Sequence, residues 1–321
     1  MKLAVLAAVL MLASACAWAQ GAVGKEDVTV ETTPEGCQLR RYTVSSPSMQ
    51  RDIRVVVVLP PGYADSAEQR YPVLYALHGR GAPYDTWSQM SPLRKALRDM
   101  PMIVVCFDGD RAGWYVDSTK KKDSQFCAFF FDELMPHVAD AYRTSGLQAV
   151  TGFSMGGHGA FYYMLTRPEM FTSVSALSAA FMEEGAWGAD FEELLGDFEE
   201  NKEAYRKTFI AERIEQYVTD GVKLPPMMSH CGTEDFLLER NRGFNAFMAE
   251  QNKRIRQRLE PQVAGIADQR ERARKLDALV AENRLEFLYK ESPGTHNWAF
   301  WRDASDEVVA FHWSHFKEAM K

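Results

Sequence analysis

Short apolar runs alternate with amphipathic stretches along most of the chain. The segments at residues 37–45 and 51–60 alternate or run apolar and are separated by SPSM, which predicts a β-hairpin. Further runs end in Gly, Ser, Asp or His and have helical periodicity between them: YPVLYALHG, PMIVVCFDG, LQAVTGFS, FTSVSALSA and PPMMSHCGTED. LEFLYKESPG supplies a last strand. Strands that alternate with helices predict an α/β fold, with a mostly parallel central sheet and helices on both faces.

Two segments lie outside this alternation. Residues 181–224 are acidic and helix-prone, and they fall between two core strands as a helical cap-like insertion would. Residues 240–284 are strongly charged with helical periodicity, and we expect Pro261 and Gly265 to break them into a helical hairpin. The rest of residues 25–321 predicts a single domain that carries both insertions.

The first residues are typical of an export signal. Lys2 precedes an apolar run at residues 3–12, and Ala-Trp-Ala ends at residue 19, so we predict a signal peptide over residues 1–19. The run is too short to span a bilayer. The sequence LASAC leaves an alternative, in which a lipid attached to Cys16 anchors the protein. We therefore expect an exported protein, periplasmic or secreted, or a lipoprotein.

The net charge limits the expected binding partners, and the cysteine content limits the expected disulfides. The net charge of −7 provides no basic field, so neither nucleic acid nor an anionic membrane surface is an expected partner. Four cysteines follow residue 19, namely Cys37, Cys106, Cys127 and Cys231, and this even number allows one or two disulfides. Cys106 and Cys231, however, end apolar runs, where free buried thiols are common. No spacing of ligands predicts a metal site, and we expect no cofactor.

In a parallel sheet, ligands bind beyond the carboxyl ends of the strands. The polar residues that follow the predicted strands are His78, Asp108, Ser154, Ser178, Glu234, Asp235 and His296. Gly152-Phe153-Ser154-Met155-Gly156 fits G-x-S-x-G, the sharp strand-to-helix turn that exposes a serine oxygen and aims the next backbone N–H at the reaction centre. A serine in an ordinary glycine-rich turn is the alternative interpretation.

A serine hydroxyl is a poor nucleophile without a base, a group that orients the base, and donors for the oxyanion. His296, in SPGTHNWAFW after the last strand, is the predicted base. GTED offers Glu234 and Asp235 as the acid, and we favour Asp235, although either acid can simply cap the next helix. The order Ser154, Asp235, His296 is the chain order of α/β-hydrolase triads.

The oxyanion donors are predicted from the turn and from an early loop. YALHGRGAPYDTW follows an early strand, and we assign the backbone N–H groups of Arg80 and Met155 to the oxyanion hole.

From about residue 50 to residue 320 the chain resembles the esterase D-like family of α/β-hydrolases. That family holds feruloyl and acetylxylan esterases of carbohydrate esterase family 1, S-formylglutathione hydrolase and mycolyltransferases. The motifs that carry the resemblance are VVVVLPPGY, YPVLYALHG, GWYVDS, DELMPHVADAYRT, GFSMGGHGAF, CGTEDFLL and PGTHNWAFW. The resemblance implies an α/β-hydrolase fold, the triad and the oxyanion donors named above.

The resemblance also implies that Trp114 and Tyr115 of GWYVDS border the acyl or sugar pocket, and Trp298 is a further candidate to stack on substrate. Thr295 and Asn297 stand where the family often has Gly and Asp. The expected activity is that of an exported serine carboxylesterase acting on small-molecule or polysaccharide esters, with feruloyl or acetyl groups favoured. The alternatives are an S-formylglutathione hydrolase-like enzyme, an acyltransferase or peptidase, and a non-catalytic binding protein on the same fold.

Overall fold

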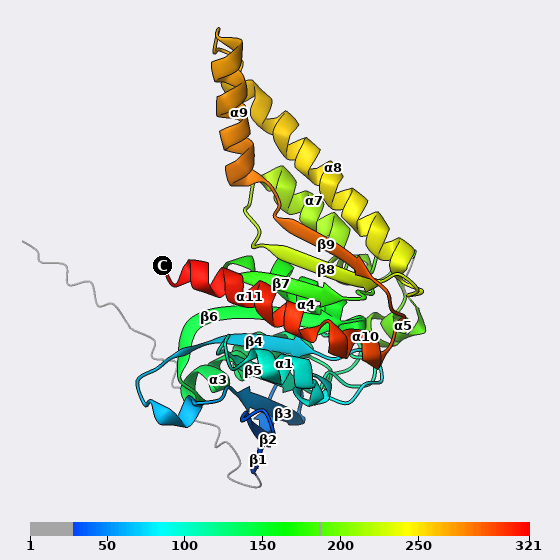
Figure 1. The fold of residues 1–321 in the computed structure, drawn as a ribbon. Helices are drawn as coiled ribbons and strands as arrows, with labels where there is room; N and C mark the ends of the chain where they lie inside the picture. The colour runs from blue at the N-terminus through cyan, green and yellow to red at the C-terminus, as the bar shows by residue number, and fades with distance from the viewer. Residues whose placement is uncertain (1–27, 186–187) are drawn as a thin grey trace, which may run out of the picture.

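A computed structural model describes residues 28–185 and 188–321. These residues contain one sheet of nine strands (Figure 1). The predicted signal peptide and Cys16 lie outside the described residues. The strands are β1 (Thr29–Thr32), β2 (Gln38–Ser46), β3 (Arg51–Leu59), β4 (Tyr71–Leu77), β5 (Ile103–Phe107), β6 (Thr144–Phe153), β7 (Ser173–Leu177), β8 (Met227–Gly232) and β9 (Phe287–Ser292). Their order is β1-β2-β3-β5-β4-β6-β7-β8-β9.

The pairing of the strands confirms the predicted fold class. β2 and β3 form the predicted antiparallel hairpin, closed where Ser46 pairs with Arg51. β3 is antiparallel to β5, and from β5 to β9 every neighbouring pair is parallel. The sheet is therefore mostly parallel, with an antiparallel edge at its N-terminal side.

Helices cover both faces of the sheet. One face carries α1 (Ser91–Ala96), α10 (Trp298–Asp303) and α11 (Ser305–Ala319), which contact one another. The other carries α2 (Phe126–Ala128), η3 (Phe129–Leu134), α3 (Met135–Ala141), α4 (Met155–Thr166), α7 (Ile210–Asp220) and the first part of α8 (Leu238–Val263). Short 3-10 turns are η1 (Tyr63–Asp65), η2 (Thr86–Gln89) and η4 (Pro168–Met170).

The run of valines in β3 shows why its pattern is continuous rather than alternating. Val55 and Val57 join the core under η3 and α4, while Val56 and Val58 join the core under α1 and α11. All four side chains are fully buried. A strand covered on both faces requires apolar side chains at successive positions, so a run of valines satisfies both layers.

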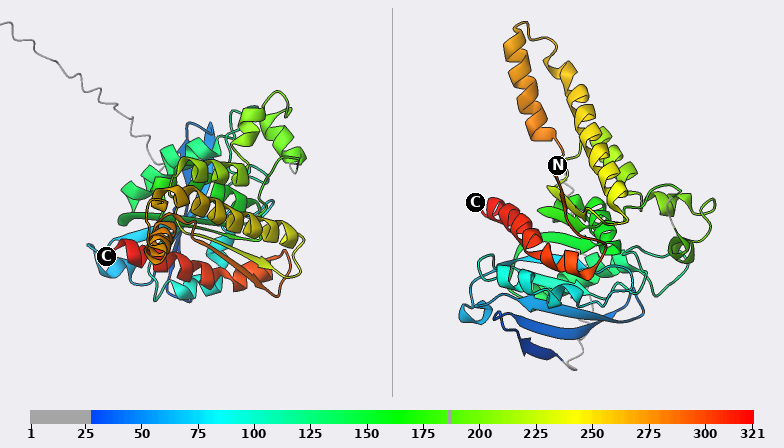
Figure 2. Two further views of the ribbon diagram at one scale, coloured as in Figure 1. Left: turned by 90° about the horizontal axis from the view of Figure 1, so that it is seen from above. Right: turned by 45° about the vertical axis from the view of Figure 1, so that its right-hand side comes forward.

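The two insertions are helical. Residues 181–224 contain α5 (Ala189–Leu195), α6 (Lys202–Arg206) and α7, and α7 packs against α4. α8 and α9 (Gln269–Asn283) form a hairpin that extends well beyond the sheet (Figures 1 and 2). The prediction that Pro261 breaks the helix is wrong, because Pro261 lies inside α8. A proline so near the helix end removes a single hydrogen bond, and the turn instead falls around Gly265.

The structure also bears on the cysteines and on membrane-spanning helices. The described cysteines are buried free thiols and form no disulfide: Cys37, Cys106, Cys127 and Cys231. No helix within the described ranges combines the length and apolarity that crossing a membrane requires.

Candidate active site

Ser154 lies at the sharp turn between β6 and α4. Its φ of 55° and ψ of −120° fall in a region that residues other than glycine rarely adopt, at a cost of about 1–3 kcal/mol. Neighbouring backbone fixes this conformation. The Ser154 N–H donates to the carbonyl of Leu177 at 2.9 Å, and its own carbonyl accepts from Gly157 at 3.0 Å and from Ala180 at 3.1 Å. The turn thus holds the serine away from the regular path of both strand and helix.

The glycines of the motif are required by close backbone packing. A Cβ atom at Gly152 would lie 2.1 Å from the carbonyl oxygen of Gly156. A Cβ atom at Gly156 would lie 2.3 Å from the carbonyl oxygen of Leu77, at the end of β4. Neither contact leaves space for a side chain, so the turn and the adjoining strand β4 approach closely only with glycine at both positions.

His296 connects the serine to an acid. Its Nε2 lies 2.9 Å from the Ser154 hydroxyl oxygen, and its Nδ1 lies 3.0 and 2.9 Å from the carboxylate oxygens of Asp235. Because a carboxylate only accepts, Nδ1 carries the proton that Asp235 receives, and Nε2 is left to accept the serine proton. The structure therefore brings together the three residues predicted as the triad.

Asp235 follows β8 and has a fully buried side chain. Burial raises its pKa, but hydrogen bonds from His296, the backbone N–H of Leu237 and Ser178 outweigh that effect and hold the pKa below the ordinary value. The carboxylate is therefore ionised at neutral pH. Glu234, the other candidate acid, is exposed, and its backbone N–H donates to the carbonyl of Gly294 at 2.9 Å.

Aromatic side chains enclose the imidazole, which sequence reasoning did not predict. Phe236 and Trp301 lie against His296 with ring centroids at 4.4 and 5.0 Å. Trp301 stacks on Phe153 at 4.4 Å, and its indole N–H donates to the hydroxyl of Ser178 at 3.1 Å. These contacts join the turn before Ser154, the end of β7 and α10, so they fix the orientation of the base from several directions.

The loop that carries His296 ends in a helix cap. The Asn297 side chain accepts from the backbone N–H of Phe300 at 3.1 Å and donates to the Thr295 hydroxyl at 2.6 Å. Asparagine is among the preferred N-cap residues. The departures at Thr295 and Asn297 thus form a local network that starts α10 directly after the base.

The loop of residues 78–82, which we call the oxyanion loop, lies beside the serine turn. A Cβ atom at Gly79 would lie 2.8 Å from the ring of Phe153, so this loop packs directly on the residue before the serine. Within the described residues, neither the Arg80 nor the Met155 backbone N–H has a hydrogen-bond acceptor. Both predicted donors are free to bind an oxyanion.

Comparison with known proteins identifies the family to which the chain belongs. A family model described as "Putative esterase" matches residues 46–311. The chain belongs to this esterase family. Esterase Rv1288 of Mycobacterium tuberculosis is 36% identical over 131 residues, which cover 39% of this chain and 28% of that protein, so the match spans less than a third of the relative's length.

Solved structures share the fold of this esterase family member. S-formylglutathione hydrolase from Agrobacterium tumefaciens has a TM-score of 0.66 at 19% identity, over 89% of this chain and 98% of that one. A ferulic acid esterase has a TM-score of 0.67 at 20% identity, over 90% of this chain and 100% of that one. At such identities the likeness shows the α/β-hydrolase fold.

The residues predicted to border the substrate pocket have different environments in this esterase. Tyr115 is fully buried, and its hydroxyl donates to the carbonyl of His78 at 2.9 Å. Its ring supports the oxyanion loop from inside and offers no surface to a ligand. Trp114 is 7% exposed, with its indole N–H donating to Asp190 at 3.1 Å. Trp298, at the start of α10, is 38% exposed.

Among the described residues, the other histidines and acids do not form a metal centre. His312 is buried, with its ring nitrogens each 2.8 Å from a hydroxyl, of Ser173 and of Ser175. In the part of the chain that the structure describes, no group of three His, Cys, Asp or Glu side chains is arranged to hold a metal ion.

Proposed function

We propose that this protein is a serine carboxylesterase in which Ser154 is the nucleophile, His296 the general base and Asp235 the group that orients His296. The observation that carries the proposal is the unbroken chain of hydrogen bonds from Ser154 through His296 to Asp235, starting at a strained strand-to-helix turn. A serine in an ordinary turn needs neither the base nor the buried acid behind it.

In the first step His296 Nε2 takes the hydroxyl proton as the Ser154 oxygen attacks the ester carbonyl carbon. The negative charge that develops on the carbonyl oxygen accepts hydrogen bonds from the backbone N–H groups of Arg80 and Met155. Loss of one such donor costs about 3 kcal/mol in other enzymes. The protonated His296 then gives its proton to the departing alcohol, which leaves an acyl group on Ser154.

In the second step water takes the place of the alcohol. His296 removes a proton from the water, and the resulting oxygen attacks the acyl carbonyl carbon. The same two backbone donors bind the second oxyanion. When it collapses, His296 returns the proton to Ser154, the carboxylic acid leaves, and the enzyme is restored. Asp235 stays ionised throughout, which stabilises the imidazolium in both steps.

For the substrate we propose feruloyl or acetyl esters on plant or other polysaccharides. The observation that supports this choice is the export-signal pattern of residues 1–19, because the fold is about equally similar to that of a ferulic acid esterase and to that of an S-formylglutathione hydrolase. An exported enzyme meets glycan esters rather than cytosolic thioesters. The S-formylglutathione hydrolase-like, acyltransferase and peptidase activities are the alternatives on the same triad.

The test compares the wild type with Ser154→Ala on p-nitrophenyl acetate, methyl ferulate, acetylated xylan, S-formylglutathione and a peptide. The proposal predicts hydrolysis of carboxylic esters by the wild type, with methyl ferulate or acetylated xylan preferred over the thioester and the peptide, and loss of that hydrolysis in the variant. Full activity in Ser154→Ala would remove the serine from the mechanism. A wild type inert on all five would favour a non-catalytic binding protein.

A further inference from the structure

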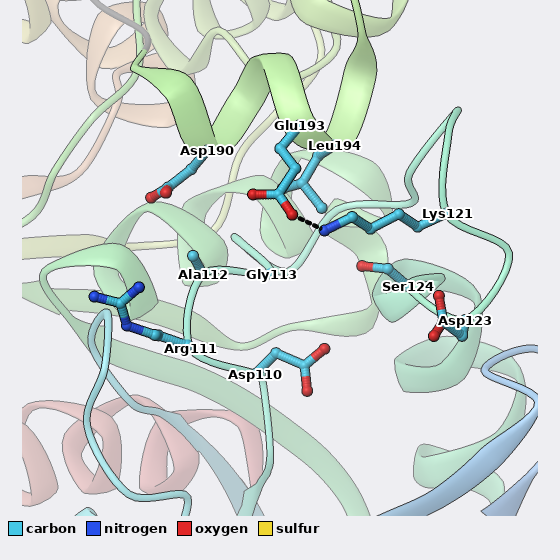
Figure 3. Close-up of a pocket in the computed structure, with 10 residues that line it drawn as sticks. All are labelled: Asp110, Arg111, Ala112, Gly113, Lys121, Asp123, Ser124, Asp190, Glu193 and Leu194. Atoms are coloured by element: carbon cyan, nitrogen blue, oxygen red, sulfur yellow. Dashed lines mark hydrogen bonds and ion pairs between the residues drawn. The ribbon is translucent and has the colours of Figure 1, made fainter.

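Two cavities lie near the active site, and the second of them lies against the loop that carries the proposed base. The first, of about 300 Å³, lies between the loop of residues 110–124 and α5, where the charged side chains of Lys121 and Glu193 pair with each other (Figure 3). The second, of about 360 Å³, is lined by most of residues 293–297, which we call the base loop. A loop beside a cavity lacks packing partners on that side, so its position depends on how its two ends are held.

A side chain of β8 holds the first end of the base loop. The hydroxyl of Ser292, the last residue of β9, lies 2.8 Å from Nε2 of His230. The Ser292 carbonyl also accepts from the backbone N–H of Thr233 at 2.9 Å, in the turn that leads to Asp235. Ser292 therefore joins the strand before the base to the turn before the acid.

The same histidine ring supports the other end of the base loop. Phe300, in α10, packs edge-on against the ring of His230, with ring centroids 5.2 Å apart. The ring of Phe300 in turn covers Gly294, where a Cβ atom would lie 2.4 Å from it. On its other side Gly294 meets the end of β8, because a Cβ atom at Gly232 would lie 2.2 Å from the Gly294 carbonyl oxygen. The base loop is thus clamped between β8 and a ring that rests on His230.

The surroundings of His230 fix its ring in one place. The residue is 3% exposed, and its carbonyl accepts from the backbone N–H of Ser178 at 2.8 Å. Burial lowers the pKa of His230, so the ring is neutral at neutral pH and has one donor and one acceptor nitrogen. An oxygen of Glu307, in α11, lies 3.4 Å from Nδ1. A carboxylate only accepts, which favours a proton on Nδ1 and leaves Nε2 to accept from the Ser292 hydroxyl.

We propose that His230 is a positioning residue for the triad, which sets the place of His296 relative to Asp235 by holding both ends of the base loop. It acts through Ser292 and Phe300 and takes no part in the proton transfers. The proposal rests on the proposed function, because the rate that the triad sets is what a misplaced base would lower. Proton transfer from serine requires the base within hydrogen-bond distance, so a small displacement of His296 is costly.

The kinetic test uses two variants that remove the same hydrogen bond from opposite sides. His230→Phe keeps an aromatic ring against Phe300, and Ser292→Ala removes only the hydroxyl. Each should lower kcat on p-nitrophenyl acetate about 5-fold, as loss of one hydrogen bond does, with KM nearly unchanged. The double variant should lose no more than either single variant, because both remove one shared bond. Rates are expressed per site titrated by a fluorophosphonate, so that unfolded protein does not count.

His312→Gln is the matched control. His312 is also a buried histidine in contact with serine hydroxyls, those of Ser173 and Ser175, but these lie toward the amino end of β7, away from the triad. This variant should lose stability and keep the kcat of the wild type. Wild-type kcat in both His230→Phe and Ser292→Ala, or an equal loss of kcat in His312→Gln, would overturn the positioning role.

A spectroscopic measurement separates this proposal from the proposed function. The proton on Nδ1 of His296, which Asp235 accepts, should give a proton NMR resonance at low field that needs no turnover. Ser292→Ala should shift this resonance, and His312→Gln should not. If Ser292→Ala leaves it unmoved, the positioning role is wrong even though esters are hydrolysed. If the resonance shifts but the wild type hydrolyses no ester, the proposed function is wrong and the positioning role stands.

Discussion

The guanidinium of Arg80 makes two hydrogen bonds, at 2.6 and 2.9 Å, to the carboxylate of Asp190 in α5. The insertion at residues 181–224 is thereby attached to the very residue whose backbone N–H we assign to the oxyanion hole. These hydrogen bonds from Arg80 hold the pKa of Asp190 below its ordinary value, so the carboxylate stays charged at neutral pH. Trp114 donates to the same carboxylate and completes the junction.

We expect Asp190→Asn to lower kcat on p-nitrophenyl acetate, because Arg80 loses the partner that restrains it. The pair is partly exposed, so about 1 kcal/mol, or roughly fivefold, is the expected size. Because p-nitrophenyl acetate is small, its kcat reports on the oxyanion loop rather than on more distant substrate contacts. Glu212→Gln, which breaks the pair between Arg206 and Glu212 within the same insertion, is the matched control. Equal kcat values for the two variants would show that the contact between Arg80 and Asp190 does not affect catalysis.

Asp235→Asn should keep the fold and reduce kcat by about 10⁴, because an amide no longer fixes the imidazole tautomer that leaves Nε2 free to accept. Steady-state kinetics at neutral pH measure the change. Glu234→Gln, one position earlier and exposed, should leave kcat close to that of the wild type. A similar loss in both variants would contradict the assignment of Asp235.

Much of this site follows from the sequence because its parts are local. The G-x-S-x-G turn, the GTED stretch and the loop before Trp298 each lie directly after an apolar run, and their order along the chain predicts the roles that we propose for them. The strands can also be predicted from the sequence, since valines at successive positions of β3 indicate a strand that is buried on both faces.

What the sequence does not reveal depends on contacts between distant segments. Phe236 and Trp301 meet at His296 only once β8, β9 and α10 are packed together. Arg80 and Asp190 are separated along the chain by the strands β5, β6 and β7. Tyr115, expected at the pocket border, is instead enclosed, because its ring fills the space above Gly109 and Gly159, where a Cβ atom would lie 2.6 and 2.4 Å from it.

The packing at the serine turn predicts opposite effects for two glycine substitutions. Gly152→Ala places a methyl group against the Gly156 backbone, and we expect it to lower the free energy of unfolding by about 3 kcal/mol. Gly243→Ala in α8 meets open space and should raise it by about 1 kcal/mol through helix propensity. Urea unfolding of both variants checks the pair, and a harmless Gly152→Ala would disprove the close approach of β6 and α4.

Buried histidines predict a loss of stability in mild acid. Burial lowers the pKa of His158 and of His312 to about 3. The unfolded chain has histidine pKa values of about 6.5, so between these limits it binds more protons than the folded state. The free energy of unfolding should therefore fall as the pH is lowered below 6.5, by about 1.4 kcal/mol per pH unit for each residue.

His312→Gln removes one of these groups. In urea unfolding between pH 7.5 and pH 5, the free energy of unfolding of this variant should fall less steeply below pH 6.5 than that of the wild type, by about 1.4 kcal/mol per pH unit. An unchanged slope would mean that His312 is protonated equally in the folded and unfolded states, against the enclosed position that it has between Ser173 and Ser175.

The most direct measurement is covalent labelling of the folded protein by a fluorophosphonate probe, followed by peptide mapping. The probe reacts with a serine only when a base activates it and donors receive the phosphonyl oxygen. We predict stoichiometric modification of Ser154 in the wild type, with no labelling of Ser154→Ala and strongly slowed labelling of His296→Ala. Intact folded protein that leaves Ser154 unmodified, or labels another serine instead, would contradict the account.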